Sequence, residues 1–157
     1  MKITFLTVGK TEDAYLKDGI NKYLTRLKHY TRLTLVEIDE LKNAKSLTRE
    51  QQKAKEAELI LKKITQLDHV ILLDENGMEL SSTQFAAYID KKALASVANL
   101  VFVVGGPYGF DPSVYARAND KISLSAMTFS HQMVRLFFVE QLYRAFTIIK
   151  GEPYHHQ

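Results

Sequence analysis

A pair of glycines directly follows one of the most apolar stretches of the sequence, an arrangement suited to holding a ligand. Gly105 and Gly106 open the segment 105–109, which comes after the apolar run 99–104. Glycines at such a place let the backbone approach a ligand closely or adopt a positive φ. The spacing matches neither a dinucleotide fingerprint nor a P-loop, so dinucleotide and nucleoside triphosphate sites lose their main support. A plain tight turn explains the glycines equally well.

A second segment, 123–129, mixes small and apolar residues beside the expected edge of a sheet. Its backbone groups are able to hold an adenine ring together with a thioether or a sulfonium. The alternative is a strand followed by a helix N-cap at Thr128 or Ser130, which local rules predict without any ligand. On the sequence alone, this second interpretation is favoured.

Ionisable side chains near the C-terminus form the third candidate group. Arg135 and Arg144 interrupt an otherwise apolar helical pattern. His131 stands near the start of that helix, where a histidine is more often a cap or a surface residue than a base. Tyr154 and His155 lie in the C-terminal tail, where such side chains bind metals, stack on bases or transfer protons. By composition alone, a disordered chain end explains the tail better.

Strands and helices alternate along the chain, and their ends position these candidate groups. The apolar patterns predict strands over 3–8, 33–38, 69–74, 99–104 and 121–125, and helices over 12–30, 48–64, 82–94, 112–117 and 131–150. This alternation is typical of an α/β fold with a largely parallel sheet. In such sheets, ligands bind at the carboxyl ends of the strands. Leu73 with Asp74, the glycine pair and 123–128 all lie there, so we expect the site among them.

Local signals predict where several of these elements begin and end. Thr11 is expected to cap the first helix, and Thr48 to begin the second helix with a capping box. Ser82 or Thr83 is expected to cap the third helix. The segment 75–77, Glu-Asn-Gly, is predicted to form a turn that ends the preceding strand.

The composition excludes several classes of protein. The 157 residues suggest a single domain, 1–157, of which 46 % are hydrophobic and 25 % charged, as in soluble globular proteins. Cysteine is absent, which excludes disulfides, thiolate zinc sites and cysteine nucleophiles. No apolar stretch is long enough to span a membrane, and the N-terminus is unlike a signal peptide, so we expect a cytoplasmic protein. The net charge of +3 permits a nucleic-acid partner without requiring one. The basic residues of 48–64, Arg49 and several lysines, are expected to form a solvated face, with contact to RNA as the less favoured alternative.

The last predicted helix, 131–150, is apolar nearly all round. Such a helix is buried on most of its sides. In so small a domain, part of that burial is expected to come from a second subunit, and a symmetric dimer is the commonest way to supply it.

Several short motifs occur in order along the chain, at 1–10, 103–109, 124–131, 134–135, 140–145 and 153–155. Together they resemble the RlmH family of bacterial ribosomal RNA large-subunit pseudouridine N3-methyltransferases, and the resemblance extends over the whole chain. It implies the SPOUT α/β fold, whose C-terminal chain threads a loop to form a trefoil knot that makes the cofactor pocket.

The resemblance also implies a homodimer, S-adenosylmethionine as the methyl donor and no metal. Its substrate is expected to be a pseudouridine in a stem-loop of large-subunit (23S) rRNA, within the assembled ribosome rather than in short RNA. The cofactor positions of the family correspond to Leu73, Gly105 with Gly106 beside it, Leu124, Ser125, Ala126, Met127, Thr128 and Phe129. These positions fall in the three strand-end segments selected above on geometric grounds.

Methylation at N3 requires that the proton on that nitrogen be removed or the developing anion stabilised. Arg135 and Arg144 are candidates for holding phosphate or developing negative charge. Tyr154 and His155 are candidates for orienting the base, with His155 also a proton acceptor, and in a dimer the tail is able to act in the partner's pocket. Two alternatives stay open, a SPOUT enzyme that acts on another RNA such as tRNA, and a ribosome-binding factor without enzymatic activity.

Overall fold

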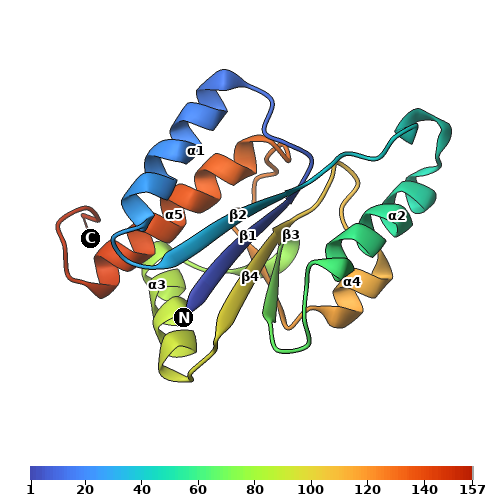
Figure 1. The fold of residues 1–157 in the computed structure, drawn as a ribbon. Coiled ribbons are helices and arrows are strands. Elements are labelled where there is room, and N and C mark those ends of the chain that lie inside the picture. Colours follow the sequence, from blue (N-terminus) through green and yellow to red (C-terminus); the bar gives the residue numbers. More distant parts are fainter. Residues whose placement is uncertain (157) are drawn as a thin grey trace.

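A five-stranded parallel sheet forms the centre of the protein, with helices on both of its faces (Figure 1). The computed structural model describes residues 1–156. The strands are β1 (Lys2–Val8), β2 (Arg32–Ile38), β3 (His69–Glu79), β4 (Asn99–Val104) and β5 (Asp120–Ser123). The helices are α1 (Ala14–Leu27), α2 (Arg49–Lys62), α3 (Ser82–Leu94), α4 (Pro112–Arg117) and α5 (Met133–Ile149), with a short 3-10 turn at Ala44–Ser46. The predicted α/β fold with a parallel sheet is confirmed.

The strand order in the sheet is β2-β1-β4-β3-β5, and every neighbouring pair is parallel. Phe5 in β1, for example, pairs with Leu35 of β2 on one side and Phe102 of β4 on the other. Helices α1, α3 and α5 cover one face of the sheet, and α2 and α4 cover the other (Figure 1). Because the strands run in one direction, all their carboxyl ends meet at one edge of the sheet.

Alternating residues of each strand supply two separate hydrophobic cores. In β4, Leu100 and Phe102 pack toward α1, α3 and α5, whereas Val101 and Val103 pack toward α2 and α4. All four side chains are at most 2 % exposed. Burial on both faces explains why β3 and β4 read as continuous apolar runs rather than as alternating patterns.

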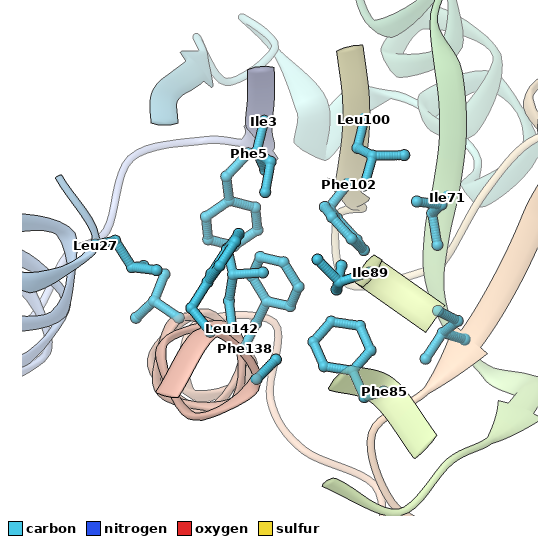
Figure 2. Packing of buried hydrophobic residues seen from close by; sticks show 14 of the residues in the cluster. Ile3, Phe5, Leu27, Ile71, Phe85, Ile89, Leu100, Phe102, Phe138 and Leu142 are labelled. Atoms are coloured by element: carbon cyan, nitrogen blue, oxygen red, sulfur yellow. The ribbon is translucent and has the colours of Figure 1, made fainter. Parts of the chain in front are cut away.

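Aromatic rings fix α5 against the sheet (Figure 2). The ring centroid of Phe138 in α5 lies 4.6 Å from that of Phe5 and 4.8 Å from that of Phe102. Leu142, one turn further along α5, is also fully buried in this core (Figure 2). The middle of α5 is therefore held firmly on the sheet, which limits where the segment before the helix lies.

The structure corrects the predicted starts of two helices. The third helix is capped by Ser81, not by Ser82 or Thr83, because the Ser81 hydroxyl accepts a hydrogen bond from Gln84 N in a capping box. The first helix begins at Ala14, and Thr11 does not cap it. The capping box of Thr48 is confirmed.

The predicted turn at 75–77 is wrong, because β3 continues through it to Glu79. The pairing of β3 with β5 shifts register between Leu73 and Met78, so that residues 74–77 form a bulge. A Cβ atom on Gly77 would lie 2.6 Å from the main-chain nitrogen of Ile122. The glycine therefore permits close approach of two strands, and its presence misled the turn prediction.

Candidate active site

A cavity of about 780 Å³ opens at the edge of the sheet where the parallel strands end. Its walls come from the ends of β3, β4 and β5, from the segments 105–109 and 123–131, and from the first turns of α2. This volume lies in the range of small-molecule sites in proteins. The cavity therefore lies at the carboxyl-end edge of the sheet, where the strand pattern predicts a ligand site.

The residues predicted to bind a cofactor come together in this cavity, with one exception. Those that line it are Leu73, Gly105, Gly106, Leu124, Ser125, Met127, Thr128 and Phe129. Ala126 is exposed and does not line it. Residues more than fifty positions apart thus form one continuous wall, which mixes apolar side chains with main-chain groups.

The glycine segment is both a tight turn and a place of close packing. Gly109 N donates a hydrogen bond to Gly106 O (3.2 Å), and Gly109 has a φ of +81°. A Cβ atom on Gly105 would lie 3.0 Å from the Phe110 ring, and one on Gly106 would lie 2.8 Å from both carboxylate oxygens of Glu56. The tight-turn interpretation is therefore correct for 106–109, and the close approach is to protein side chains.

Glu56 supports the glycine segment from α2. Its side chain is 5 % exposed and accepts a hydrogen bond from Gln52 Nε2 (3.2 Å). Burial raises the pKa of Glu56 above its ordinary value, with nearby Glu40 acting in the same direction and Gln52 opposing it. A buried carboxylate thus fills the space that a side chain at Gly106 would need.

We expect Gly106→Ala to lower the free energy of unfolding by about 1–3 kcal/mol, because the new methyl group overlaps the Glu56 carboxylate. Urea denaturation of the single variants and of the double variant Gly106→Ala, Glu56→Ala measures the effect. Removing the carboxylate frees the space, so the double variant should lose less than the sum of the two single losses. Strictly additive losses would show that the two residues do not compete for this space.

Internal hydrogen bonds shape the segment 124–130. Ser123 Oγ donates to Ser125 O (2.8 Å), and Ser125 Oγ accepts from Met127 N (2.9 Å). These bonds turn the chain at the end of β5, so the strand stops at Ser123 rather than at the predicted 125. Ser130 Oγ accepts from Met133 N (3.0 Å), which leads the chain into α5.

Two carboxylates from the β3 bulge make one wall of the cavity acidic. Asp74 accepts hydrogen bonds from the Tyr115 hydroxyl and from Asn76 N. Glu75 accepts from Thr128 Oγ1 (3.0 Å), so Thr128 fastens its segment to β3 instead of capping a helix. Burial, and then the bond to Asp74, raise the pKa of Tyr115, which keeps its phenol protonated.

Arg135 lies inside the protein rather than in the cavity. Its side chain is 1 % exposed. The guanidinium donates to Val8 O (2.8 Å), Gly9 O (2.9 Å) and His131 O (3.0 Å), and also to Thr11 Oγ1 (3.2 Å). These bonds tie the start of α5 to the end of β1, and the guanidinium is occupied by them.

His131 lines the cavity, one turn before Arg135. Burial, and then the charge of Arg135, lower the pKa of His131 below its ordinary value, while Glu12 and Glu40 act in the opposite direction. An imidazole whose pKa is lowered in this way is neutral near pH 7. The sequence favoured a cap or surface position for His131 over a role as a base, and the side chain is half-buried in the cavity wall instead.

The other three predicted catalytic residues gather at the far end of α5. The Tyr154 hydroxyl donates to Glu140 Oε1 (2.9 Å) and lies 3.3 Å from that of Tyr23. The Arg144 guanidinium is ion-paired with Glu140, stacks 4.8 Å over the Tyr154 ring, and lies 3.1 Å from His155 Nδ1. The tail is packed on α1 and α5, so the preferred interpretation of a disordered end is wrong.

The tail follows the last turn of α5 and folds back along the helix, so that Tyr154 contacts Glu140. The helix spans 17 residues, so its ends are about 25 Å apart. His131 and Val134 at the beginning of α5 line the cavity. The C-terminal tail follows the last turn of the helix (Figure 1). Among the described residues, none of the tail, 151–156, lines the cavity of its own chain.

Arg49 and Lys53 are cavity residues that sequence reasoning missed. The sequence favoured a solvated face of α2 over RNA contact for them; Arg49 is indeed exposed, whereas Lys53 is half-buried at the cavity. They stand four residues apart and continue the inward-facing stripe of Glu56 and Ile60 toward the start of the helix. That spacing indicates a shared face of the helix, but the other lysines of α2 made all its basic residues resemble a solvated face.

Some site types are absent from the part of the chain that the structure describes. Residues 1–156 contain no group of three or more metal-ligating side chains placed to hold an ion. Within the same residues, no helix is both long and apolar enough to span a membrane.

Comparison with known proteins identifies the family. Residues 1–155 match the family model described as "Predicted SPOUT methyltransferase". Proteins named "Ribosomal RNA large subunit methyltransferase H" are similar over their full length. The protein of Cytophaga hutchinsonii is 56 % identical over 99 % of this chain. The proteins of Flavobacterium psychrophilum and Parabacteroides distasonis are 55 % and 53 % identical over the whole of this chain. Each of the three relatives is covered over its full length.

A solved structure shows the same fold at low sequence identity. It is described as a probable methylase family protein from Haemophilus influenzae Rd KW20, and it is 15 % identical with a TM-score of 0.51. The match covers 99 % of this chain and 70 % of that one. The full-length family match, the similar relatives and the cavity at the strand ends agree, and the chain belongs to the SPOUT methyltransferase family.

Proposed function

We propose that this protein methylates N3 of a pseudouridine in large-subunit ribosomal RNA, with S-adenosylmethionine as the methyl donor. The family membership and the names of the similar proteins support methylation of ribosomal RNA. The observation that carries the proposal is that all the residues matched to the family's cofactor positions, except Ala126, line one cavity. The assembled ribosome is the proposed substrate, because so small a protein offers few contacts of its own to a short RNA.

The cavity suits this donor in size and in chemistry. Leu73, Leu124 and Phe129 supply apolar surface for an adenine ring, and main-chain groups of 105–109 and 124–129 supply hydrogen bonds. The carboxylates of Asp74 and Glu75 favour a cationic ligand. S-adenosylmethionine, when bound there, supplies the methyl group for an in-line displacement.

Alignment of the acceptor nitrogen is the main task of the protein, since a displacement of this kind requires little covalent chemistry from it. Arg135 serves this task as a positioning residue, because its bonds to Val8 O and Gly9 O fix the start of α5 and with it His131. We do not assign Arg135 a contact with RNA, since its guanidinium is buried and occupied. In this respect the structure changes the role expected from the sequence.

A homodimer would bring the tail of one subunit to the cavity of the other. In this structure the described tail residues pack on Tyr23, Glu140 and Arg144, and none of them lines the cavity of its own chain. Beside the cavity, Met127 is 76 % exposed and Phe137 40 % exposed, and such apolar side chains favour contact with a second copy. We propose that the trefoil knot of the family forms the cavity in each single-domain subunit.

The tail residues then divide the chemistry between them. Burial, followed by the bonds to Tyr23 and Glu140, raises the pKa of Tyr154, so this phenol keeps its proton and does not take that of the base. It orients the base as a donor once its hydrogen bond passes from Glu140 to the base. A guanidinium can only donate, so His155 Nδ1 accepts from Arg144. We propose that His155 exchanges this contact for the base and that Arg144, freed from it, holds the developing negative charge.

Saturable binding of S-adenosylmethionine by the purified protein, measured by calorimetry, tests the first step of the proposal. We expect one site per chain, and we expect Leu124→Arg to abolish binding because the new side chain enters the cavity. Binding that survives this substitution would place the donor elsewhere. A protein that binds ribosomal particles but no donor would be a binding factor and not an enzyme.

A further inference from the structure

We propose that Arg49 and Lys53 form the site where the phosphate backbone of the substrate RNA is held beside the cavity. This inference rests on the proposed function, and it names residues that neither the family resemblance nor the motifs point to. Both side chains line the mouth of the cavity from the first turns of α2. Arg49 is exposed and Lys53 half-buried, so both are within reach of a ligand.

Arg49 is held in place by an aromatic side chain of the glycine segment. Its guanidinium carbon lies 4.8 Å over the ring of Tyr108, which is 43 % exposed. A cation over an aromatic face keeps its charge and its hydrogen-bond donors. The contact therefore joins α2 to the segment 105–109 and presents a fixed guanidinium at the cavity mouth.

Neither cation is neutralised by an ion pair. Among residues 1–156, no carboxylate lies within 4.0 Å of the charged nitrogens of Arg49 or Lys53. Asp111 is close enough for the charge of Lys53 to contribute to its lowered pKa, but its carboxylate is hydrogen-bonded chiefly to Ser113. Glu50 shares the rim, which leaves the α2 side with a net positive charge.

The cavity mouth is electrostatically asymmetric. The α2 side carries Arg49 and Lys53, whereas the β3 bulge carries Asp74 and Glu75. Polyanionic RNA is attracted to the first side and repelled by the second, and phosphate contacts of this kind set the position and direction of a strand. The asymmetry therefore orients the RNA so that its backbone follows α2 while the target base enters the cavity.

Other lysines of α2 provide a matched control. Lys55 and Lys62 are exposed and do not line the cavity. Replacing both by glutamine removes the same charge from the same helix as Arg49→Gln with Lys53→Gln. Any difference in ribosome binding between the two double variants then reflects where the lost charges lie on α2 and not how many charges are lost.

Equilibrium binding to ribosomes that lack the modification, measured over a range of salt concentrations, tests the proposal. We expect Arg49→Gln, Lys53→Gln to raise the Kd about tenfold or more and to reduce the slope of log K against log salt by about 1.5, as for two lost phosphate contacts. The control variant should stay within about twofold, and both variants should bind S-adenosylmethionine like the unmodified protein.

Three outcomes would overturn the inference. The first is that the Arg49, Lys53 variant binds ribosomes as tightly as the control variant. The others are that this variant loses donor binding but keeps ribosome binding, or that the unmodified protein does not bind ribosomes. Methyl transfer, measured in parallel, tests the proposed function separately. Ribosome binding that depends on Arg49 and Lys53 without any methyl transfer would uphold this inference and refute the proposed function. Methyl transfer together with ribosome binding that does not depend on Arg49 or Lys53 would refute this inference and uphold the proposed function.

Discussion

Replacing Arg135 by leucine is expected to lower the free energy of unfolding by about 3–5 kcal/mol. The side chain is 1 % exposed, and its guanidinium satisfies the carbonyls of Val8, Gly9 and His131. Leucine fills part of the volume but removes the guanidinium donors from all three carbonyls, leaving Gly9 O only its bond from the Thr7 hydroxyl (3.3 Å), and each buried acceptor that is left unpaired costs on the order of 1–3 kcal/mol. Because the bonds join β1 to α5, the variant should also bind S-adenosylmethionine more weakly.

Urea denaturation of Arg135→Leu beside Arg144→Leu is the appropriate comparison. Arg144 is half-buried and pairs chiefly with Glu140 one turn away, so its removal should cost on the order of 1 kcal/mol or less. Arg135→Lys should recover little of the loss, since a single ammonium cannot reproduce the fork of donors. An Arg135→Leu protein within about 1 kcal/mol of the unmodified one would mean that these carbonyls find other partners.

Replacing His155 by alanine is expected to lower the rate constant of methyl transfer about hundredfold at saturating donor and ribosome, the lower end of the range for a lost proton-transfer group. His155 lies in the tail cluster, with Nδ1 3.1 Å from Arg144. His156→Ala is the matched control, since this neighbouring histidine is exposed. Single-turnover methyl transfer measures both variants, and a His155→Ala rate within about twofold of the unmodified protein would exclude the role in proton transfer.

Mixing two inactive variants tests whether the tail acts on the partner subunit. Protein carrying His155→Ala retains its cavity, and protein carrying Leu124→Arg retains its tail. Random exchange into mixed dimers should restore up to about a quarter of the normal rate, because each mixed dimer contains one intact cavity facing one intact tail. Two variants that stay inactive when mixed would indicate that the tail serves its own chain.

The order of elements was predictable from the sequence because it depends on local patterns. The buried strands appear as apolar runs, as in β4 (Asn99–Val104), whose bounds were predicted correctly. The capping box of Thr48 is likewise local, since its partner is three residues away. The cavity followed from the same patterns, because the ends of parallel strands must meet at one edge.

The features that sequence reasoning missed depend on contacts between distant residues. Arg135 has its main partners at Val8 and Gly9, more than 120 positions away, and nothing near it in the sequence indicates that its guanidinium is buried. The tail is similar, since Tyr154 is fixed by Tyr23 of α1 and by Glu140 of α5. A polar side chain in an apolar helix has two explanations, a site or a buried network, and only the tertiary structure distinguishes them.

The predictions for Gly77 and Lys53 were wrong for a related reason. Gly77 was read as a turn, but it allows β3 to approach Ile122 of β5. Lys53 was read as one of several solvated lysines, although it lies on the stripe that faces the cavity. In both cases the residue type is compatible with two structures, and the three-dimensional neighbours decide between them.

The most direct test of the proposed function is methyl transfer from labelled S-adenosylmethionine to ribosomes that lack the modification, with the product nucleotide identified by mass spectrometry. We predict 3-methylpseudouridine in the large-subunit RNA, and transfer that is abolished by Leu124→Arg. A different methylated nucleotide, or transfer only to another RNA such as tRNA, would contradict the proposed substrate while leaving the family assignment intact. Absence of both transfer and donor binding would contradict the enzymatic function itself.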